Sequence, residues 1–121
     1  MKDRGFLSSL AHAFRGIRET SRRERNFRIQ LLFAIGAVAL CILFRVSAAQ
    51  FALVALAIFF VLAAELFNTA IEAAVDLASG GRPHPLAKAA KDAAAGGVLL
   101  AAAFAAVVAI IVGAEVIGRY L

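Results

Sequence analysis

The stretch FALVALAIFFVLAAELFNTAIEAAVD, residues 51–76, decides how this chain folds. Its first fourteen residues carry no charge, and the carboxylates of Glu65, Glu72 and Asp76 follow them. At about 100° per residue, these three side chains and that of Asn68 fall on one face of a helix. The stretch therefore predicts a long apolar helix whose last turns carry a polar face.

The whole chain is too apolar for a small water-soluble domain. Of its 121 residues, 63% are hydrophobic, whereas soluble domains average about 45–50%. The mean hydropathy is +0.87, and a soluble domain of this size cannot hide so much apolar surface in one core. The composition predicts a small integral membrane protein. The single cysteine, Cys41, cannot form a disulfide within the chain, and we interpret it as a packing residue.

Three apolar runs predict an all-α fold with three transmembrane helices, each of which needs about 20 predominantly apolar residues. We expect one domain, 1–121, with spans at about 27–45, 49–77 and 86–118. Residues 78–86, ASGGRPHPL, contain two glycines and two prolines, and they predict the turn between the last two spans.

The N-terminal segment, residues 5–22, has the pattern of an amphipathic helix. Phe6, Leu10, Phe14 and Ile17 recur at helical spacing, and arginines occupy other faces. We expect this helix to lie flat in the headgroup region of the bilayer.

Positive charge gathers in two parts of the chain. Eight of the thirteen lysines and arginines lie within residues 2–28, and three more lie within 78–92. Because basic residues mark the cytoplasmic side, we expect both segments in the cytoplasm and the C-terminus outside. A basic arm that binds nucleic acid is the alternative. Next to transmembrane helices, binding to anionic lipid is the stronger interpretation, and we expect no nucleic-acid partner.

Polar side chains from three segments are predicted to meet at one membrane level. Glu24 precedes the first span, Glu72 ends the second, and Lys91 and Asp92 precede the third. At 1.5 Å per residue, Glu65 lies about 21 Å into the second span, still within a hydrocarbon core about 30 Å thick. A carboxylate at that depth indicates a functional site.

This set of side chains suits phosphoryl transfer to a lipid hydroxyl. Glu24 and Glu72 can hold Mg²⁺ together with phosphate oxygens, and Lys91 can neutralise phosphate charge. Glu65 can accept the proton of an alcohol in the bilayer. The residues alone leave other interpretations open. Asn68 can be an interhelical hydrogen-bonding residue, the interfacial charges can be merely solvated, and Glu65 can belong to a structural ion pair.

Two other classes of function remain as alternatives. An ion-coupled transporter subunit also uses membrane carboxylates, but this polar set clusters on one side instead of lining a path. A non-enzymatic assembly factor would use small residues at four-residue spacing in the third span, which favour close helix packing. These are Ala93, Gly97, Ala101, Ala105, Ala109 and Gly113.

Three blocks of the sequence carry a family resemblance: ERNFRIQ (24–30), AELFNTAIEAAVDL (64–77) and LAKAAKDAAAGGVLL (86–100). In this order they resemble the signature blocks of the prokaryotic diacylglycerol kinase / undecaprenol kinase family, and the resemblance covers nearly the whole chain. It implies a homotrimer in the bacterial cytoplasmic membrane, with active sites between subunits. Such an enzyme transfers the γ-phosphate of ATP to a lipid alcohol and uses Mg²⁺.

The resemblance also implies roles for residues at matching positions. Glu65 matches the catalytic base, in contact with the lipid substrate, and Glu24 and Glu72 match ligands of the metal. The loop 79–85, around Arg82 to His84, resembles a segment that contacts adenine. A larger set matches the ATP-binding residues. These are His12, Glu24, Asn68, Glu72, Lys91 and Asp92.

The blocks 24–30 and 64–77 look more like the undecaprenol kinase branch than the diacylglycerol branch. We therefore expect undecaprenol as the acceptor, giving undecaprenyl phosphate, with diacylglycerol, giving phosphatidic acid, as the alternative. Two positions depart from the family pattern. His12 stands where relatives often have tyrosine, and Gln30 stands where they often have histidine or glutamate, so no role is assigned to Gln30.

Overall fold

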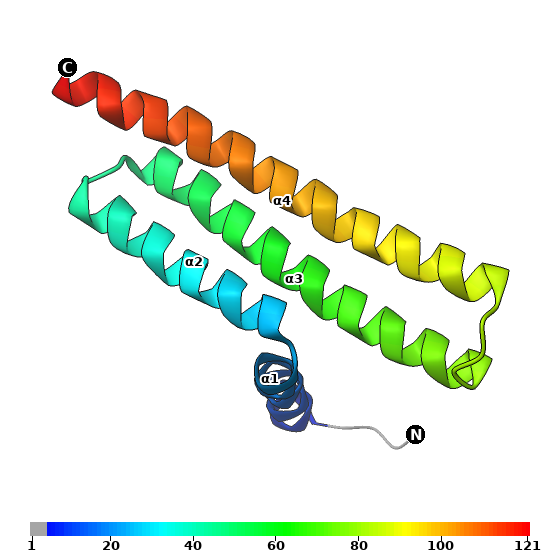
Figure 1. Ribbon diagram of the computed structural model, residues 1–121. Helices are drawn as coiled ribbons and strands as arrows, with labels where there is room; N and C mark the ends of the chain where they lie inside the picture. Colours follow the sequence, from blue (N-terminus) through cyan, green and yellow to red (C-terminus); the bar gives the residue numbers. More distant parts are fainter. Residues whose placement is uncertain (1–4) are drawn as a thin grey trace.

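The structure, a computed structural model, describes residues 5–121 and consists of four helices (Figure 1). They are α1 (Phe6–Arg23), α2 (Arg25–Leu43), α3 (Ala48–Ser79) and α4 (Pro85–Tyr120), and this part of the chain contains no strand. The last three are long and apolar enough to cross a membrane. The predicted all-α fold, with a short N-terminal helix before three membrane-spanning helices, is confirmed.

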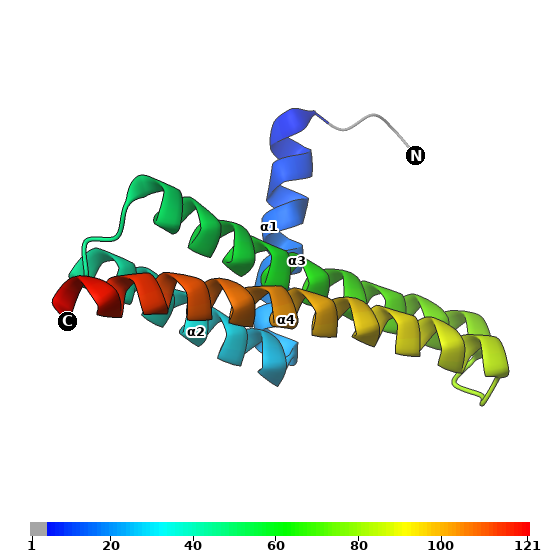
Figure 2. The same ribbon diagram turned by 90° about the horizontal axis from the view of Figure 1, so that it is seen from above.

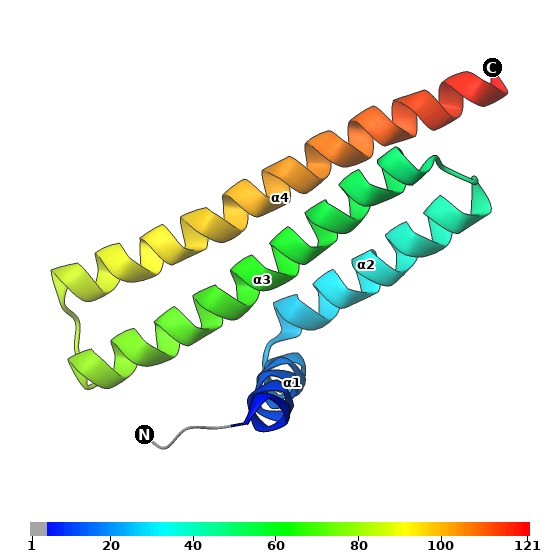
Figure 3. The same ribbon diagram turned by 180° about the vertical axis from the view of Figure 1, so that it is seen from behind.

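α3 is the central helix of the bundle. It packs along α4 on one side and along the shorter α2 on the other, and α2, α3 and α4 run in alternating directions (Figures 1 and 3). No Cα atom of α2 lies within 8 Å of one from α4. α1 stands across the bundle and contacts α2 and α3 where α2 begins (Figure 2).

α3 and α4 are much longer than α2, with 32 and 36 residues against 19. At 1.5 Å per residue, α2 is about 28 Å long and α3 extends about 20 Å further. The length of α2 matches a hydrocarbon core of about 30 Å. The hairpin tip, which we define as residues 72–92, therefore projects past the level at which α1 crosses the bundle (Figure 1).

Residues with suitable backbone preferences form the turn between α3 and α4. Gly80 (φ 64°) and Gly81 (φ 76°) take the left-handed conformation that ends α3, and glycine adopts it without steric cost. Pro85 is the first residue of α4. Proline has no backbone N–H, and at this position an N–H would have no hydrogen-bond partner within the helix. The backbone N–H of Leu86 donates to Nδ1 of His84 at 3.1 Å, which caps the helix.

Few side chains are buried within the chain. Ala57 of α3 and Val108, Val112 and Val116 of α4 form the hydrophobic core cluster. Many large apolar side chains face outward instead, for example Phe33 with 76% of its surface exposed. A helix that is hydrophobic all round belongs in a lipid environment, so the chain is a membrane protein.

The ends of α2 and α4 are tied together at the opposite end of the bundle from the hairpin tip. The guanidinium of Arg119 donates hydrogen bonds to the backbone carbonyls of Phe44 and Arg45, the latter at 3.3 Å. The ring of Tyr120 meets that of Phe44 edge-on at 6.0 Å. The last carbonyls of a helix lack intrahelical partners, so Arg119 satisfies acceptors at the end of α2.

We predict that Arg119→Gln lowers the free energy of unfolding by about 1 kcal/mol, because the carbonyls at the end of α2 lose a charged donor. The measurement is thermal unfolding in detergent micelles, followed by circular dichroism. Arg18→Gln is the control, since it removes the same charge from an exposed position on α1. Equal Tm values for the two variants would contradict the assignment of Arg119 as a cap.

Candidate active site

Glu65 is buried at the junction of α1, α2 and α3. Only 5% of its surface is exposed. The carboxylates of Glu24 and Glu72 are near enough to repel a negative charge on Glu65. Glu24 is partly buried between α1 and α2, and Glu72 is exposed. The junction therefore gathers three carboxylates, two from one face of α3 and one from the start of α2.

Phe27 closes the same junction. It is 1% exposed, and α2 packs only against α1 and α3. Phe27 lies about one turn after Glu24, so both side chains project from one face of α2. Because Glu24 acts on Glu65, we infer that this face of α2 lies toward the junction and that the phenyl ring helps to exclude water from it.

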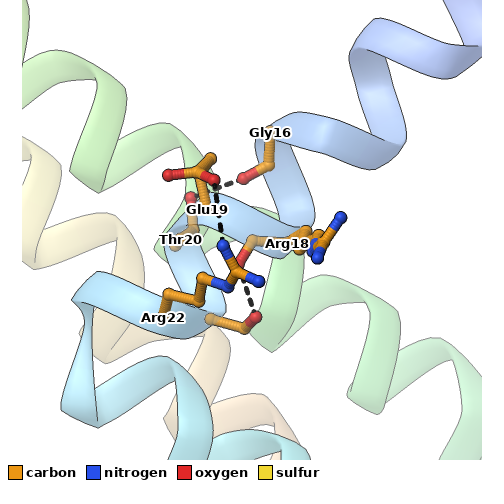
Figure 4. A network of polar contacts seen from close by, with 6 residues as sticks. Gly16, Arg18, Glu19, Thr20 and Arg22 are labelled. Carbon is orange, nitrogen blue, oxygen red and sulfur yellow. Dashed lines mark hydrogen bonds and ion pairs between the residues drawn. The ribbon is translucent and has the colours of Figure 1, made fainter.

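The angle between α1 and α2 is held by a second arginine cap. The guanidinium of Arg28 donates to the backbone carbonyls of Ser21 and Arg22, at 3.1 Å and 2.9 Å. Further contacts at this end of α1 stay within the helix (Figure 4). Thr20 Oγ1 donates to the carbonyl of Gly16 at 2.9 Å, Ser21 Oγ donates to the carbonyl of Arg18 at 2.7 Å, and Glu19 pairs with Arg22 at 3.8 Å. These contacts fix the position of Glu24 between the two helices.

Asn68 orients Glu72. Its Nδ2 donates to Glu72 Oε1 at 2.7 Å, an i,i+4 pair on the polar face of α3. Its Oδ1 is buried and finds no hydrogen-bond donor among the described residues. Asn68 therefore presents a free acceptor oxygen beside the carboxylates.

The described residues contain no group of three or more His, Cys, Asp or Glu side chains placed to hold a metal ion. Mg²⁺, however, usually binds through one or two carboxylates and completes its shell with substrate phosphates and water. Glu24 and Glu72 offer hard oxygen ligands, and their mutual proximity to Glu65 concentrates negative charge there. This donor set fits Mg²⁺ that arrives together with a phosphate ligand.

Two ion pairs organise the hairpin tip. Lys91 Nζ of α4 lies 2.5 Å from Asp76 Oδ1 of α3, and Lys88 Nζ lies 2.6 Å from Asp92 Oδ2 within α4. The charge of Glu72 also acts on Lys91. A pocket of about 590 Å³ opens beside these pairs, which we name the loop pocket. Its polar lining residues are Asp76, Ser79, Arg82, His84, Lys88, Lys91 and Asp92.

An apolar groove approaches the junction from the other direction. It has a volume of about 1040 Å³ and runs along α3 between α2 and α4. Tyr120 lines its far end, and Val61, one turn before Glu65, lines its near end. Gln30 also lines the near end, and its buried Oε1 has no hydrogen-bond partner within residues 5–121. The near end of the groove therefore lies about one helical turn from Glu65.

Comparison with known proteins identifies the family. The family model described as prokaryotic diacylglycerol kinase matches residues 11–113. The chain belongs to this family. It is 41% identical over 107 residues to an undecaprenol kinase of Bacillus subtilis (strain 168), a match that covers 88% of this chain and 86% of the relative. It is 41% identical over 102 residues to a diacylglycerol kinase of Synechocystis sp., covering 84% of this chain and 58% of that longer relative.

Membership of the prokaryotic diacylglycerol kinase family confirms the resemblance carried by the three sequence blocks. It also confirms the class of enzyme, a lipid kinase. A kinase implies use of ATP. The role of each individual residue stays a prediction.

The structure brings some of the predicted site residues together and leaves others apart. Glu24 and Glu72 lie close enough to Glu65 for their charges to act on it, and Asn68 is bonded to Glu72. Lys91 of α4 pairs with Asp76, one turn after Glu72, and the charge of Glu72 also acts on it. Two predicted ATP-binding residues lie elsewhere. Asp92 points to Lys88, and His12 is exposed on α1, twelve residues before Glu24 and thus about 18 Å away along the helix.

Sequence reasoning gave no role to Phe27, Arg28 or Asp76, although each shapes the site. The sequence could have indicated Phe27, since it follows Glu24 at helical spacing within the first family block. Arg28 had only its position beside a predicted helix boundary, where basic residues are common in membrane proteins. The partner of Asp76 depends on how α3 and α4 are aligned along each other.

We predict that a water-soluble carbodiimide with an amine modifies Glu65 much more slowly than Glu72, because Glu65 is 5% exposed. Phe27→Ala should remove the cover and accelerate modification of Glu65, while Glu72 keeps its rate. Mass spectrometry of peptides from the protein in detergent measures both. Phe33→Ala, at an exposed position on α2, is the matched control. Similar rates at Glu65 and Glu72 in the unsubstituted protein would contradict the buried junction.

Proposed function

We propose that this chain transfers the γ-phosphate of ATP to the hydroxyl of undecaprenol, with diacylglycerol as the second candidate acceptor. The observation that carries this proposal is that Glu65 is buried, under the influence of two other carboxylates, one turn beyond Val61 at the end of an apolar groove. A lipid alcohol needs such a boundary, because its hydrocarbon stays in the bilayer while its hydroxyl meets a phosphate.

The acceptor is inferred from the relatives and the sequence blocks together. The relative named undecaprenol kinase is matched over 86% of its length, whereas the relative named diacylglycerol kinase is matched over 58%. The chain spans a little over half of that second protein, so its specificity transfers less readily. The blocks 24–30 and 64–77 also favour undecaprenol.

Glu65 is assigned as the general base. A carboxylate within hydrogen-bonding reach of a hydroxyl can accept its proton as the oxygen attacks phosphorus. The low exposure of Glu65 supports this assignment, because exclusion of water limits hydrolysis of the nucleotide. The groove supports it as well, since Val61 in its wall lies one turn from Glu65.

Glu24 and Glu72 are assigned to bind Mg²⁺, with Asn68 holding Glu72 in place through its 2.7 Å hydrogen bond. Bound Mg²⁺ neutralises charge on the phosphate oxygens of a nucleotide. Lys91 offsets the remaining phosphate charge as a cation on the facing helix. Asp92, His12 and the loop 79–85 are assigned to the rest of the nucleotide.

We infer a homotrimer in the bacterial cytoplasmic membrane with active sites between subunits. Two observations support more than one copy: His12 lies far from the carboxylates of its own chain, and large apolar side chains such as Phe33 face outward. The basic residues of α1 and the hairpin tip favour a cytoplasmic N-terminus and an external C-terminus. The hairpin tip then reaches the compartment that contains ATP.

The acceptor and the base are tested in one assay. Purified protein in detergent with Mg²⁺ and γ-labelled ATP should label undecaprenol in preference to diacylglycerol. Glu65→Gln should lower kcat about 10²–10⁴-fold, because the neutral amide cannot take the proton, while the affinity for nucleotide is retained. Label on diacylglycerol alone would overturn the acceptor, and wild-type turnover by Glu65→Gln would overturn the base.

The metal assignment is tested by a Mg²⁺ titration. Glu72→Gln should raise the Mg²⁺ concentration for half-maximal activity by at least about tenfold, because one negatively charged ligand is lost. Glu115→Gln is the control, since it removes a carboxylate from the far end of the bundle, where Gln50 Nε2 bonds it at 2.9 Å. Superimposable titrations for Glu72→Gln and the unsubstituted enzyme would exclude Glu72 as a ligand.

A further inference from the structure

The ion pair between Lys91 and Asp76 joins the two long helices at the wall of the loop pocket. Its Nζ–Oδ1 distance is 2.5 Å, and the side chains are 39% and 58% exposed. Asp76 follows Glu72 by one turn on the polar face of α3, and the charge of Glu72 also acts on Lys91. The ammonium of Lys91 thus contacts one carboxylate of the facing helix and lies within the electrostatic influence of the carboxylate one turn before it.

The second ion pair of the hairpin tip has a different geometry. Lys88 and Asp92 are four residues apart on α4, so they form the local pair that is common on exposed helices. Lys91 and Asp76 come from different helices and can meet only when α3 and α4 are aligned as they are here. The position of Lys91 therefore depends on a residue of another element.

A lysine ammonium needs such a partner if it is to stay at one position in a binding site. Its ammonium is a point charge on a flexible four-carbon stem, which samples many rotamers when nothing holds it. The ammonium carries three N–H donors, and one bond to Asp76 leaves two for a phosphate. Protein kinases use the same principle, because their phosphate-binding lysine is held by an acidic residue from a separate helix.

We propose that Asp76 is a positioning residue that holds the ammonium of Lys91 beside Glu72, where the phosphate groups of ATP bind. The inference rests on the proposed function, because it takes Lys91 as a phosphate ligand. Asp76 acts through Lys91 and does not itself touch the nucleotide. Its carboxylate is consequently needed for nucleotide affinity more than for the chemical step.

Asp76→Asn should raise the KM for MgATP about fivefold, the upper end of what an exposed ion pair contributes. The change in kcat should be smaller than the change in KM. Asp76→Glu keeps the carboxylate and should restore most of the affinity. Glu115→Ala, which removes the acceptor of the hydrogen bond from Gln50 between α3 and α4 at the far end, should leave KM unchanged and so controls for general loosening of the hairpin.

The deciding experiment is a double-mutant cycle with Lys91→Met. The readout is the Kd of a non-hydrolysable ATP analogue with Mg²⁺, measured by equilibrium dialysis, since it does not require turnover. We expect Asp76→Asn to weaken binding in the wild-type background and to have no further effect in the Lys91→Met background. An equal loss in both backgrounds would show that Asp76 does not act through Lys91 and would overturn the inference.

Two other outcomes are decisive. Tighter analogue binding by Asp76→Asn would mean that Asp76 competes with phosphate for Lys91, which overturns the positioning role. Phosphate transfer by the wild-type enzyme is measured in the same preparation, so that failure of the proposed function can be told from failure of this inference. Absence of wild-type phosphate transfer overturns the proposed function and the inference with it, whereas transfer with additive effects of the two substitutions overturns the inference alone.

Discussion

A carboxylate almost completely removed from water lies where three helices meet, and burying such a group is unfavourable unless its charge is compensated. The charges that act on Glu65 come from Glu24 and Glu72, which are themselves acidic. The chain therefore holds an electrostatically unfavourable cluster in place by packing, through Phe27, the Arg28 cap and the long contact of α3 with α4. A cation at the junction would offset these negative charges.

Because α2 is shorter than α3 and α4, the apolar part of the site and its charged part lie at different levels along the bundle. α2 is about as long as the hydrocarbon core is thick, and α1 crosses the bundle where α2 begins (Figure 2). Apolar side chains lie on one side of that level, along the groove, and ion pairs lie on the other, in the hairpin tip. Glu65 lies at the boundary. A lipid can approach Glu65 from the bilayer without entering water, and a charged ligand can approach it from water without entering the bilayer.

The sequence was sufficient for features that depend on one helix at a time. Periodicity placed Glu65, Asn68 and Glu72 on one face of α3, and two glycines and two prolines marked the turn before α4. Contacts between helices were not accessible in the same way. That Lys91 meets Asp76, and that Phe27 covers the junction, depends on the alignment of helices separated by many residues. Residue counting gave the depth of Glu65 along α3, but it could not show that protein side chains exclude water from it.

The arginine at the end of α4 has a consequence for the order in which the molecule is made. The carbonyls of Phe44 and Arg45 accept from Arg119, which the ribosome adds 74 residues after Arg45. A backbone carbonyl without a donor is unfavourable in lipid, and the donor that Arg119 supplies to this end of α2 exists only after α4 has been translated. Synthesis of the last turn of α4 then ties the first membrane-spanning helix to the third.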